Sequence, residues 1–185
     1  MTIDLVWILV VVGALAFTIW RLSALAGRID RLHHRIELAH QSLDNQLVRR
    51  ARAAEALATS GLIDPASAIV LAQAASNARN ADPADLVERG QVESEMSRDL
   101  REILSDPEAV ADLSAVPEGR ELLEDLASSC TGVAMSRRFL NDGVQATRLL
   151  RSGRLVRLFR LAGHAPMPMT VEMDDEVAPA LAALV

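Results

Sequence analysis

Aromatic residues, cysteine and lysine are scarce or missing in this sequence. It has no tyrosine and no lysine, two tryptophans, three phenylalanines and one cysteine. Because strands draw on aromatic and β-branched residues, this composition favours helices over a β-sandwich. The single cysteine, Cys130, excludes an internal disulfide and a cysteine-based zinc cluster. Its simplest role is that of a small apolar residue on the inner face of a helix.

Short motifs of the common enzyme classes are also missing. The chain has no G-x-x-x-x-G-K-[ST], no G-x-G-x-x-G, no H-E-x-x-H and no G-x-S-x-G. Nucleic-acid binding is disfavoured, because the middle of the chain is strongly acidic and stacking residues are few. We therefore expect no cofactor, no metal and no nucleic-acid partner.

Charge is distributed in blocks along the chain. Residues 61–136 hold 5 arginines and 15 acidic residues, whereas residues 137–160 hold 7 arginines and 1 acidic residue. Residues 1–60 hold 7 arginines and 5 acidic residues, and residues 161–185 hold 4 acidic residues and no arginine. An acidic middle between two basic segments predicts charge pairing, within the chain or with a partner.

The apolar run Leu5–Trp20 (LVWILVVVGALAFTIW) is the longest uncharged stretch of the chain. A helix over it is about 24 Å long, and a snorkelling Arg21 helps it to reach the roughly 30 Å of a bilayer core. Trp7 and Trp20 lie near its two ends, where indoles prefer the membrane interface. The run predicts a membrane-spanning helix, and the lipid bilayer is its expected partner.

The flanks of this run bear on cleavage and orientation. Ala24-Leu25-Ala26 has the form of a signal-peptide cleavage site, but the region before the run carries Asp4 and no basic residue, which favours an uncleaved anchor. The positive-inside rule predicts an external N-terminus and a cytoplasmic bulk of the chain at the cell membrane. The arginines that follow the run are Arg21, Arg28, Arg31 and Arg35.

A seam of apolar residues predicts that the same helix continues beyond the membrane. Its members are Leu22, Leu25, Ile29, Leu32, Ile36, Ala39 and Leu43, at alternating spacings of three and four. Because the seam covers only three heptads, we favour packing within the chain over an intermolecular coiled coil, which would make a homo-oligomer. His33, His34 and His40 flank the seam without the i, i+4 spacing of metal ligands, so we expect them to face solvent.

Capping signals divide the remaining chain into helices. The first helix should end near Ser60-Gly61, and Asp64-Pro65 should begin a second one that reaches about Ala78. Asp82-Pro83 repeats this signal and predicts a third helix that ends near Ser105. Residues 106–119 contain two prolines and a glycine and predict a loop with at most one helical turn. A long fourth helix should then end at Gly153, with Leu122, Leu126, Cys130, Val133, Leu140 and Val144 facing inward.

The predicted fold is all-α, with an N-terminal transmembrane helix followed by an antiparallel bundle of about four long helices. We expect the anchor over residues 1–21, the bundle over residues 22–152, and an amphipathic basic segment with an acidic, proline-containing tail over residues 153–185. Alternating helix directions return the end of the fourth helix towards the bilayer. Arg148, Arg151, Arg154, Arg157 and Arg160 then either contact anionic lipid or pair with the acidic middle of the chain.

Two stretches resemble the LemA family. Ala39–Arg50 (AHQSLDNQLVRR) is similar to its A-x-S-x-I-D-x-Q-L-x-R-R segment, and Ser136–Val144 (SRRFLNDGV) is similar to its R-R-F-Y-N-D-A-V segment. Ala78-Arg79 stands where the family has A-R, and the likeness covers residues 5–175. The tail (FRLAGHAPMPMTVEMDDE) resembles a divergent, actinobacterial branch. The resemblance implies a membrane protein with a helical bundle and brings no catalytic residue.

The chain departs from the family pattern at several positions. The apolar L-I-P-N-L stretch is replaced by Arg52–Ala56, the tyrosine of the second motif is Leu140, and a later Y-N pair is Thr147-Arg148. Any functional surface of the family at these positions is therefore altered in this chain.

An enzyme is the alternative from another class. Arg120–Asp125 (RELLED) resembles the core of a Nudix box, whose carboxylates hold Mg²⁺ against a pyrophosphate. The surrounding pattern fails, with Asp106 and Ala127 where glycines belong and Asp112 where a glutamate belongs, and no strands are predicted. We prefer an acidic first turn that favours the helix dipole.

The residues that we single out are Arg49, Arg50, Arg137, Arg138 and Asn141. They form either a structural network of ion pairs and hydrogen bonds, with Asp44 or Asp142 as partners, or an exposed surface for a protein partner. The sequence thus predicts a non-enzymatic scaffold or adaptor at the cytoplasmic membrane. A membrane-bound Mg²⁺-dependent hydrolase and a lipid-surface sensor through residues 148–161 are the alternatives.

Overall fold

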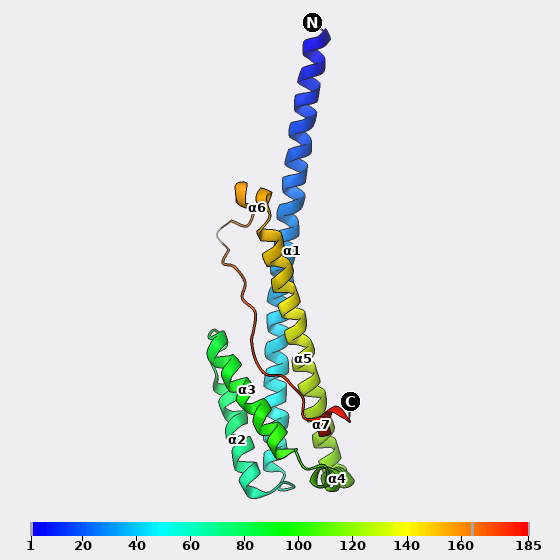
Figure 1. Ribbon diagram of the computed structural model, residues 1–185, viewed down its shortest axis with the longest axis vertical. Coiled ribbons are helices and arrows are strands. Elements are labelled where there is room, and N and C mark those ends of the chain that lie inside the picture. The colour runs from blue at the N-terminus through cyan, green and yellow to red at the C-terminus, as the bar shows by residue number, and fades with distance from the viewer. Residues whose placement is uncertain (1, 164, 185) are drawn as a thin grey trace. The chain divides into compact units, whose positions relative to one another are not determined.

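The computed structural model describes residues 2–163 and 165–184, with side chains from Val6 onward (Figure 1). The predicted outer bounds, residues 1 and 185, lie outside the described residues. All regular elements in this part of the chain are helices, so the prediction of an all-α fold is confirmed. They are α1 (Thr2–Thr59), α2 (Pro65–Asn80), α3 (Leu86–Ile103), α4 (Pro107–Ala115), α5 (Pro117–Arg151), α6 (Arg154–Leu158) and α7 (Pro179–Ala182).

The chain forms two compact units. Unit 1 consists of Met1–Leu38 and Asp142–Met169, and unit 2 consists of Ala39–Asn141 and Thr170–Val185. Both α1 and α5 are continuous helices that contribute residues to each unit. The fold therefore has one local packing environment in each unit.

Unit 1 contains the apolar run and a small packed region. Helix α1 contains a stretch that is long and apolar enough to cross a membrane, and this most apolar window is not buried by any other described part of the chain. Beyond this run, Ile29 and Ile36 of the predicted seam are buried, together with Val144 and Thr147 of α5 and Val156 of α6. The seam therefore packs within the chain, as expected.

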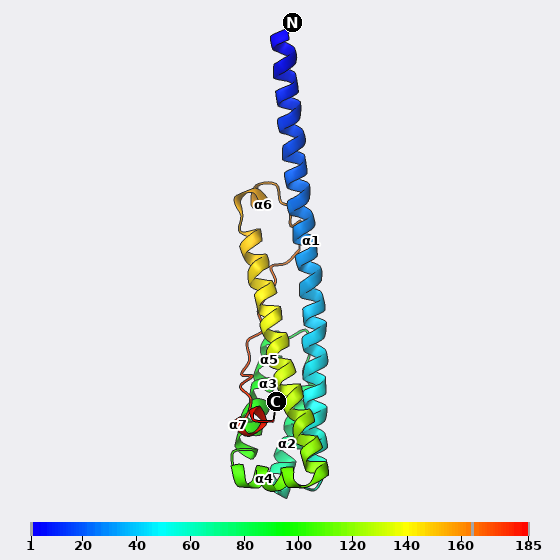
Figure 2. The ribbon, with the colours of Figure 1, turned by 90° about the vertical axis from the view of Figure 1, so that its right-hand side faces the viewer.

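Unit 2 contains the main hydrophobic core. The C-terminal part of α1, α2, α3 and the N-terminal part of α5 lie side by side and form the predicted helical bundle (Figures 1 and 2). Large core side chains include Leu57, Leu71, Met96, Leu123 and Leu126, each fully buried. Complete burial of a leucine side chain stabilises the fold by about 1.5–3 kcal/mol. Alanines at other core positions of these four helices let the helices approach closely, namely Ala51, Ala53, Ala54, Ala58, Ala74, Ala75, Ala78 and Ala127.

Aspartate side chains cap the first turns of α2, α3 and α4. Asp64 accepts hydrogen bonds from the N–H groups of Ala66 and Ser67, and Pro65 begins α2, as predicted. The third helix does not begin at Asp82-Pro83, however, and that prediction is wrong. Asp82 and Pro83 form a turn closed by the Asp85 N–H on the Asp82 carbonyl (3.2 Å), and Asp85 then caps α3.

The predicted loop over residues 106–119 is also wrong. Asp106 caps α4, Pro107 occupies its first turn, and after Val116 the chain enters α5 at Pro117. Proline is favourable at the first helical position, because the N–H that it lacks has no partner there. The two prolines of this stretch therefore mark two helix starts. Of the residues predicted to face inward on α5, all are buried except Leu122, which is half-buried.

The last part of unit 2 is an extended segment that ends in the short helix α7. We name Thr170–Leu184 the C-terminal strap. Ala178 and Leu181 of the strap belong to the core cluster of unit 2, and both are buried. The strap therefore contributes to the core, whereas the sequence predicted only an acidic, proline-containing tail.

Candidate interaction site

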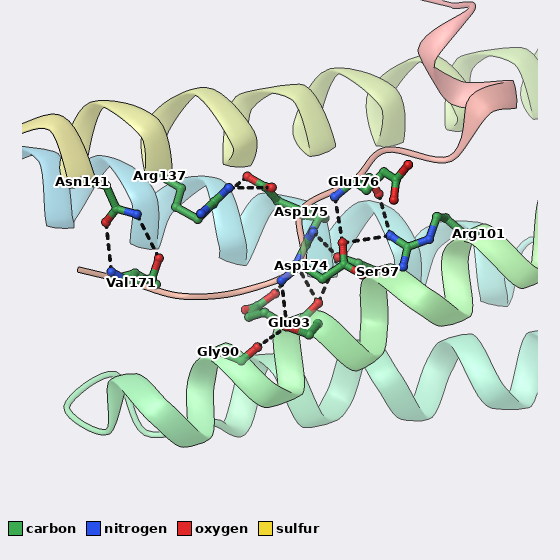
Figure 3. A network of polar contacts seen from close by, with 12 residues as sticks. Gly90, Glu93, Ser97, Arg101, Arg137, Asn141, Val171, Asp174, Asp175 and Glu176 are labelled. Carbon is green, nitrogen blue, oxygen red and sulfur yellow. Dashed lines mark hydrogen bonds and ion pairs between the residues drawn. The ribbon is translucent and has the colours of Figure 1, made fainter. Parts of the chain in front are cut away.

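The strap lies in a groove between α3 and α5 within unit 2 (Figure 3). On α3, Gly90, Ser94 and Arg101 recur at spacings of four and seven, which places them on one helix face. On α5, Arg137 and Asn141 are four residues apart and share a face for the same reason. The four polar residues of this set hydrogen-bond to the strap, and Gly90 lies against the strap backbone.

Asn141 holds the strap by its backbone. Its side-chain Nδ2 donates to the Val171 carbonyl (3.1 Å), and its Oδ1 accepts from the Val171 N–H (2.9 Å). The amide thus satisfies both backbone groups of one residue. A contact of this kind requires an extended chain but not a particular side chain.

Two arginines on opposite walls of the groove form ion pairs with two adjacent carboxylates of the strap (Figure 3). Arg101 of α3 donates to both carboxylate oxygens of Asp174 (3.1 and 2.5 Å), and Arg137 of α5 donates through Nε and Nη2 to Asp175 (2.7 and 2.8 Å). Successive side chains of an extended chain point in opposite directions, so a pair of adjacent aspartates reaches both walls. Paired N–H···O bonds of this type add geometric specificity to the charge attraction.

The floor of the groove at α3 is shaped by a glycine and a serine. A Cβ atom at Gly90 would overlap the carbonyl oxygen of Glu172, so the strap reaches its position only because residue 90 has no side chain. Ser94 donates to the Gly90 carbonyl (2.5 Å) and accepts from the Asp174 N–H (2.9 Å). Arg101 also donates to the Glu176 carbonyl (3.0 Å).

These contacts shift the pKa values of the groups involved. The hydrogen bond from Arg101 lowers the pKa of the Asp174 carboxyl, and partial burial opposes this effect. The pKa of Arg101 is raised by its bond to Asp174, and that of Arg137 by its bond to Asp175. The groove therefore stabilises the charged forms and accepts an anionic segment.

A second polar cluster lies in the core of unit 2. Arg50 donates to the Glu93 carboxylate (2.5 Å) and to the Ser97 hydroxyl (3.0 Å), and both Arg50 and Glu93 are at most 2% exposed. Burial raises the pKa of Glu93 even though the charges of Arg50 and Arg89 lower it. Because neither charge reaches solvent, this cluster fixes the packing of α1 against α3 and offers no docking surface.

The other predicted motif residues have separate environments. Arg49 pairs with Asp125 on the surface (2.6 Å), with both side chains about half exposed, and Arg138 is exposed. Asp44 pairs with Arg89 (2.8 Å), so it is not a partner of the predicted arginines. Asp142 has no pairing with them among the described contacts. The structure thus brings together Arg137 and Asn141, places Arg50 in the core, and leaves Arg49 and Arg138 at the surface.

In unit 1, two of the five predicted membrane-surface arginines contact the chain backbone. Arg148 donates to the Pro168 carbonyl (2.9 Å), and Arg151 donates to the carbonyls of Ala165 and Pro166 (2.6 and 2.7 Å). Arg151 also lies 3.5 Å from the His33 ring, which is half-buried rather than fully exposed. The remaining three, Arg154, Arg157 and Arg160, are exposed.

The strap is the part of the site that sequence reasoning missed. The motif residues Arg137 and Asn141 were singled out, but Arg101, Ser94, Gly90 and the strap aspartates were not. A usable signal exists in the two adjacent aspartates followed by apolar Ala178 and Leu181. It is weak, because an acidic, proline-containing segment is also typical of a solvated tail.

The enzyme alternative gains no geometric support. Glu121 and Glu124 are exposed, and Asp125 pairs with Arg49. Over residues 2–163 and 165–184, no three His, Cys, Asp or Glu side chains are grouped so that they could hold a metal ion.

Comparison with known proteins adds no relative, since no family model, curated protein or solved structure matches the chain. The features of this chain that bear on function are the geometry of the groove, the buried and exposed charges, and the apolar run of α1.

Proposed function

We propose that the protein is a non-enzymatic, membrane-anchored adaptor of LemA type, whose helical unit presents a binding surface at the cytoplasmic face. The observation that carries this proposal is the exposure of the apolar run. Val6, Trp7, Leu9, Val11, Leu15, Phe17 and Trp20 are each more than half exposed, which is costly in water and favourable in lipid. The arginines that follow the run support the cytoplasmic orientation.

Two measurements test the anchor and its orientation. Carbonate should fail to extract the full chain from membranes, whereas Val10→Arg/Leu15→Arg should release it, because each arginine at the centre of a span costs about 2.5–3.5 kcal/mol. Arg52→Leu/Arg98→Leu, which changes two exposed arginines of unit 2, is the control and should stay in the pellet. A C-terminal cytoplasm-only reporter should be active, and an export-only reporter should be silent. Extraction of the unchanged chain would refute the anchor, and an active export-only reporter would refute the orientation.

A second candidate function is contact with anionic lipid through residues 148–161. Arg151, Arg157 and Arg160 line an open hollow of about 450 Å³ in unit 1, and Leu158 and Phe159 are exposed beside it. Within this unit, α6 lies beside the part of α1 that follows the apolar run (Figures 1 and 2). Each arginine near an anionic surface contributes about 1 kcal/mol to binding.

Amide exchange of the full chain in nanodiscs tests the lipid contact. Addition of an anionic lipid to zwitterionic discs should slow exchange in residues 154–161, and Arg154→Gln/Arg157→Gln/Arg160→Gln should abolish this change. The control Arg52→Gln/Arg98→Gln/Arg138→Gln removes the same charge from unit 2 and should keep it. Equal exchange in both lipid compositions would rule out the contact.

A further inference from the structure

We propose that the groove between α3 and α5 is a binding site for an extended acidic segment of a partner protein, and that the strap is its built-in competitor. The partner segment would carry two adjacent acidic residues. A small apolar residue would follow three positions after the second acidic residue, and a leucine would follow six positions after that same acidic residue. This inference deepens the adaptor function proposed above and rests on it.

The groove binds the strap through its extended backbone, two carboxylates and two apolar side chains, and a separate peptide can have all of these features. Asn141 and Ser94 bind the backbone of the strap, and they require only an extended conformation. Arg101 and Arg137 read the two carboxylates. Ala178 and Leu181 supply the buried apolar contacts. Backbone bonds give affinity in such modes of recognition, and the charges and apolar positions give specificity.

The polar residues that contact the strap belong to bundle helices. They lie on α3 and α5, which are held in the bundle by core residues of the helices, such as Met96, Leu100, Leu123 and Leu126. The strap is an extended segment rather than a bundle helix, and residues 165–169 before it have no regular structure. The strap can therefore leave the groove without the loss of a bundle helix.

Covalent linkage makes the strap a strong competitor. A short connection gives an attached segment an effective concentration in the millimolar range, so a free peptide of the same sequence binds the unchanged chain poorly. A strap with weakened contacts should open the groove to a peptide added in trans. This difference would show that the groove accepts the segment as a separate peptide.

The experiment titrates a fluorescently labelled peptide of residues 165–184 with the full chain in detergent micelles. Unchanged protein should bind it only weakly. Asp174→Asn/Asp175→Asn, which removes both ion pairs of the attached strap, should bind it at least about tenfold more tightly. A peptide with the same two aspartates replaced by asparagine should bind this variant at least about tenfold more weakly than the acidic peptide.

Gly90→Ala in the Asp174→Asn/Asp175→Asn background is the matched control. Alanine has a higher helix propensity than glycine, so α3 should be retained and circular dichroism should not change. The added Cβ should nevertheless block the path of the peptide at Glu172 and abolish saturable binding.

Three outcomes would overturn the proposal. These are equal peptide affinity of the unchanged and the Asp174→Asn/Asp175→Asn chains, equal binding of the acidic and the neutral peptide, and saturable binding to the Gly90→Ala chain. Light scattering of an equimolar mixture of unchanged and Asp174→Asn/Asp175→Asn chains adds a fourth. A dimer in this mixture would mean that the groove binds the strap of a second copy of the chain instead of a partner protein. None of these results depends on membrane insertion, so they are independent of the extraction and reporter tests.

Discussion

Arginines of unit 1 and of unit 2 have the same side chain but different environments. Arg50 of unit 2 is almost fully buried against Glu93, and Arg101 and Arg137 hold carboxylates at the edge of the bundle. Arg154, Arg157 and Arg160 of unit 1 are exposed. Water screens the interactions of a surface charge, and burial removes this screening. The contribution of an arginine to the free energy of unfolding therefore depends on how deeply it is buried.

The largest effect is expected in the buried cluster of unit 2. Glu93→Ala leaves the Arg50 charge buried without its counter-charge, and should lower the free energy of unfolding by about 3–5 kcal/mol. The control Arg50→Met/Glu93→Leu replaces both charges by apolar groups of similar size. Its free energy of unfolding should be much closer to that of the unchanged protein. Urea unfolding of the full chain in micelles, followed by circular dichroism, measures both. Equal losses in the two variants would show that the pair contributes packing alone.

A smaller effect is expected at the groove, where two adjacent arginines provide an internal comparison. Arg137→Ala removes both hydrogen bonds to Asp175 and should weaken strap binding by about 1–3 kcal/mol. Amide exchange in residues 170–178 should then become at least about fivefold faster. Arg138→Ala, next to it in the sequence but exposed, should leave this exchange within about twofold, because surface substitutions change stability little. Similar acceleration by both changes would contradict the assignment of Arg137 to the strap.

Acid should weaken the strap through Asp174. Arg101 lowers the pKa of this carboxyl from its ordinary value of 3.8 in the bound strap, so the released strap takes up the proton more readily. The contribution of Asp174 is therefore complete above about pH 4 and is lost as the pH falls through the lowered pKa. Nuclear magnetic resonance should detect the loss as a lower protection factor of the Val171 and Asp174 amides, which compares the exchange rate with the intrinsic rate at the same pH.

The Asp174→Asn variant is the control for this titration. In this variant the strap should be bound more weakly already at pH 6. The protection of its amides should change less between pH 5 and pH 3 than in the unchanged protein. If the variant and the unchanged protein lose protection to the same extent over this range, Asp174 is not the group that titrates.

The smallest effect is expected for the exposed arginines of unit 1. Arg154→Gln/Arg157→Gln/Arg160→Gln should change the free energy of unfolding by less than about 0.5 kcal/mol, because these side chains are solvated. The same urea titration in zwitterionic detergent measures it. A loss above about 2 kcal/mol would mean that these arginines stabilise the fold, and it would remove the contrast with the buried cluster.

The three Asp-Pro pairs of the chain show that the same local sequence signal can mark a helix start or a turn. Asp-Pro at residues 64–65 correctly predicted the start of α2, but the same signal at residues 82–83 marks a turn. At residues 106–107 it begins α4, where a loop was expected. An aspartate side chain caps a turn or a helix by similar short-range hydrogen bonds, so the choice depends on whether the following residues can bury an apolar face. That choice is made by the tertiary packing.

The sequence by itself determined the all-α fold, the seam of α1, the apolar run and most of the inward positions of α5. These features follow from periodicities of three to four residues and from the length of an apolar helix, which are local properties. Only the tertiary structure decided that Arg50 is buried, that Arg49 and Arg138 remain at the surface, and that Arg137 and Asn141 hold the strap. The contacts made by these residues join positions at least 30 apart, such as Asn141 with Val171 and Arg50 with Ser97. Spacing within one helix does not specify such contacts, because they arise when separate elements pack together.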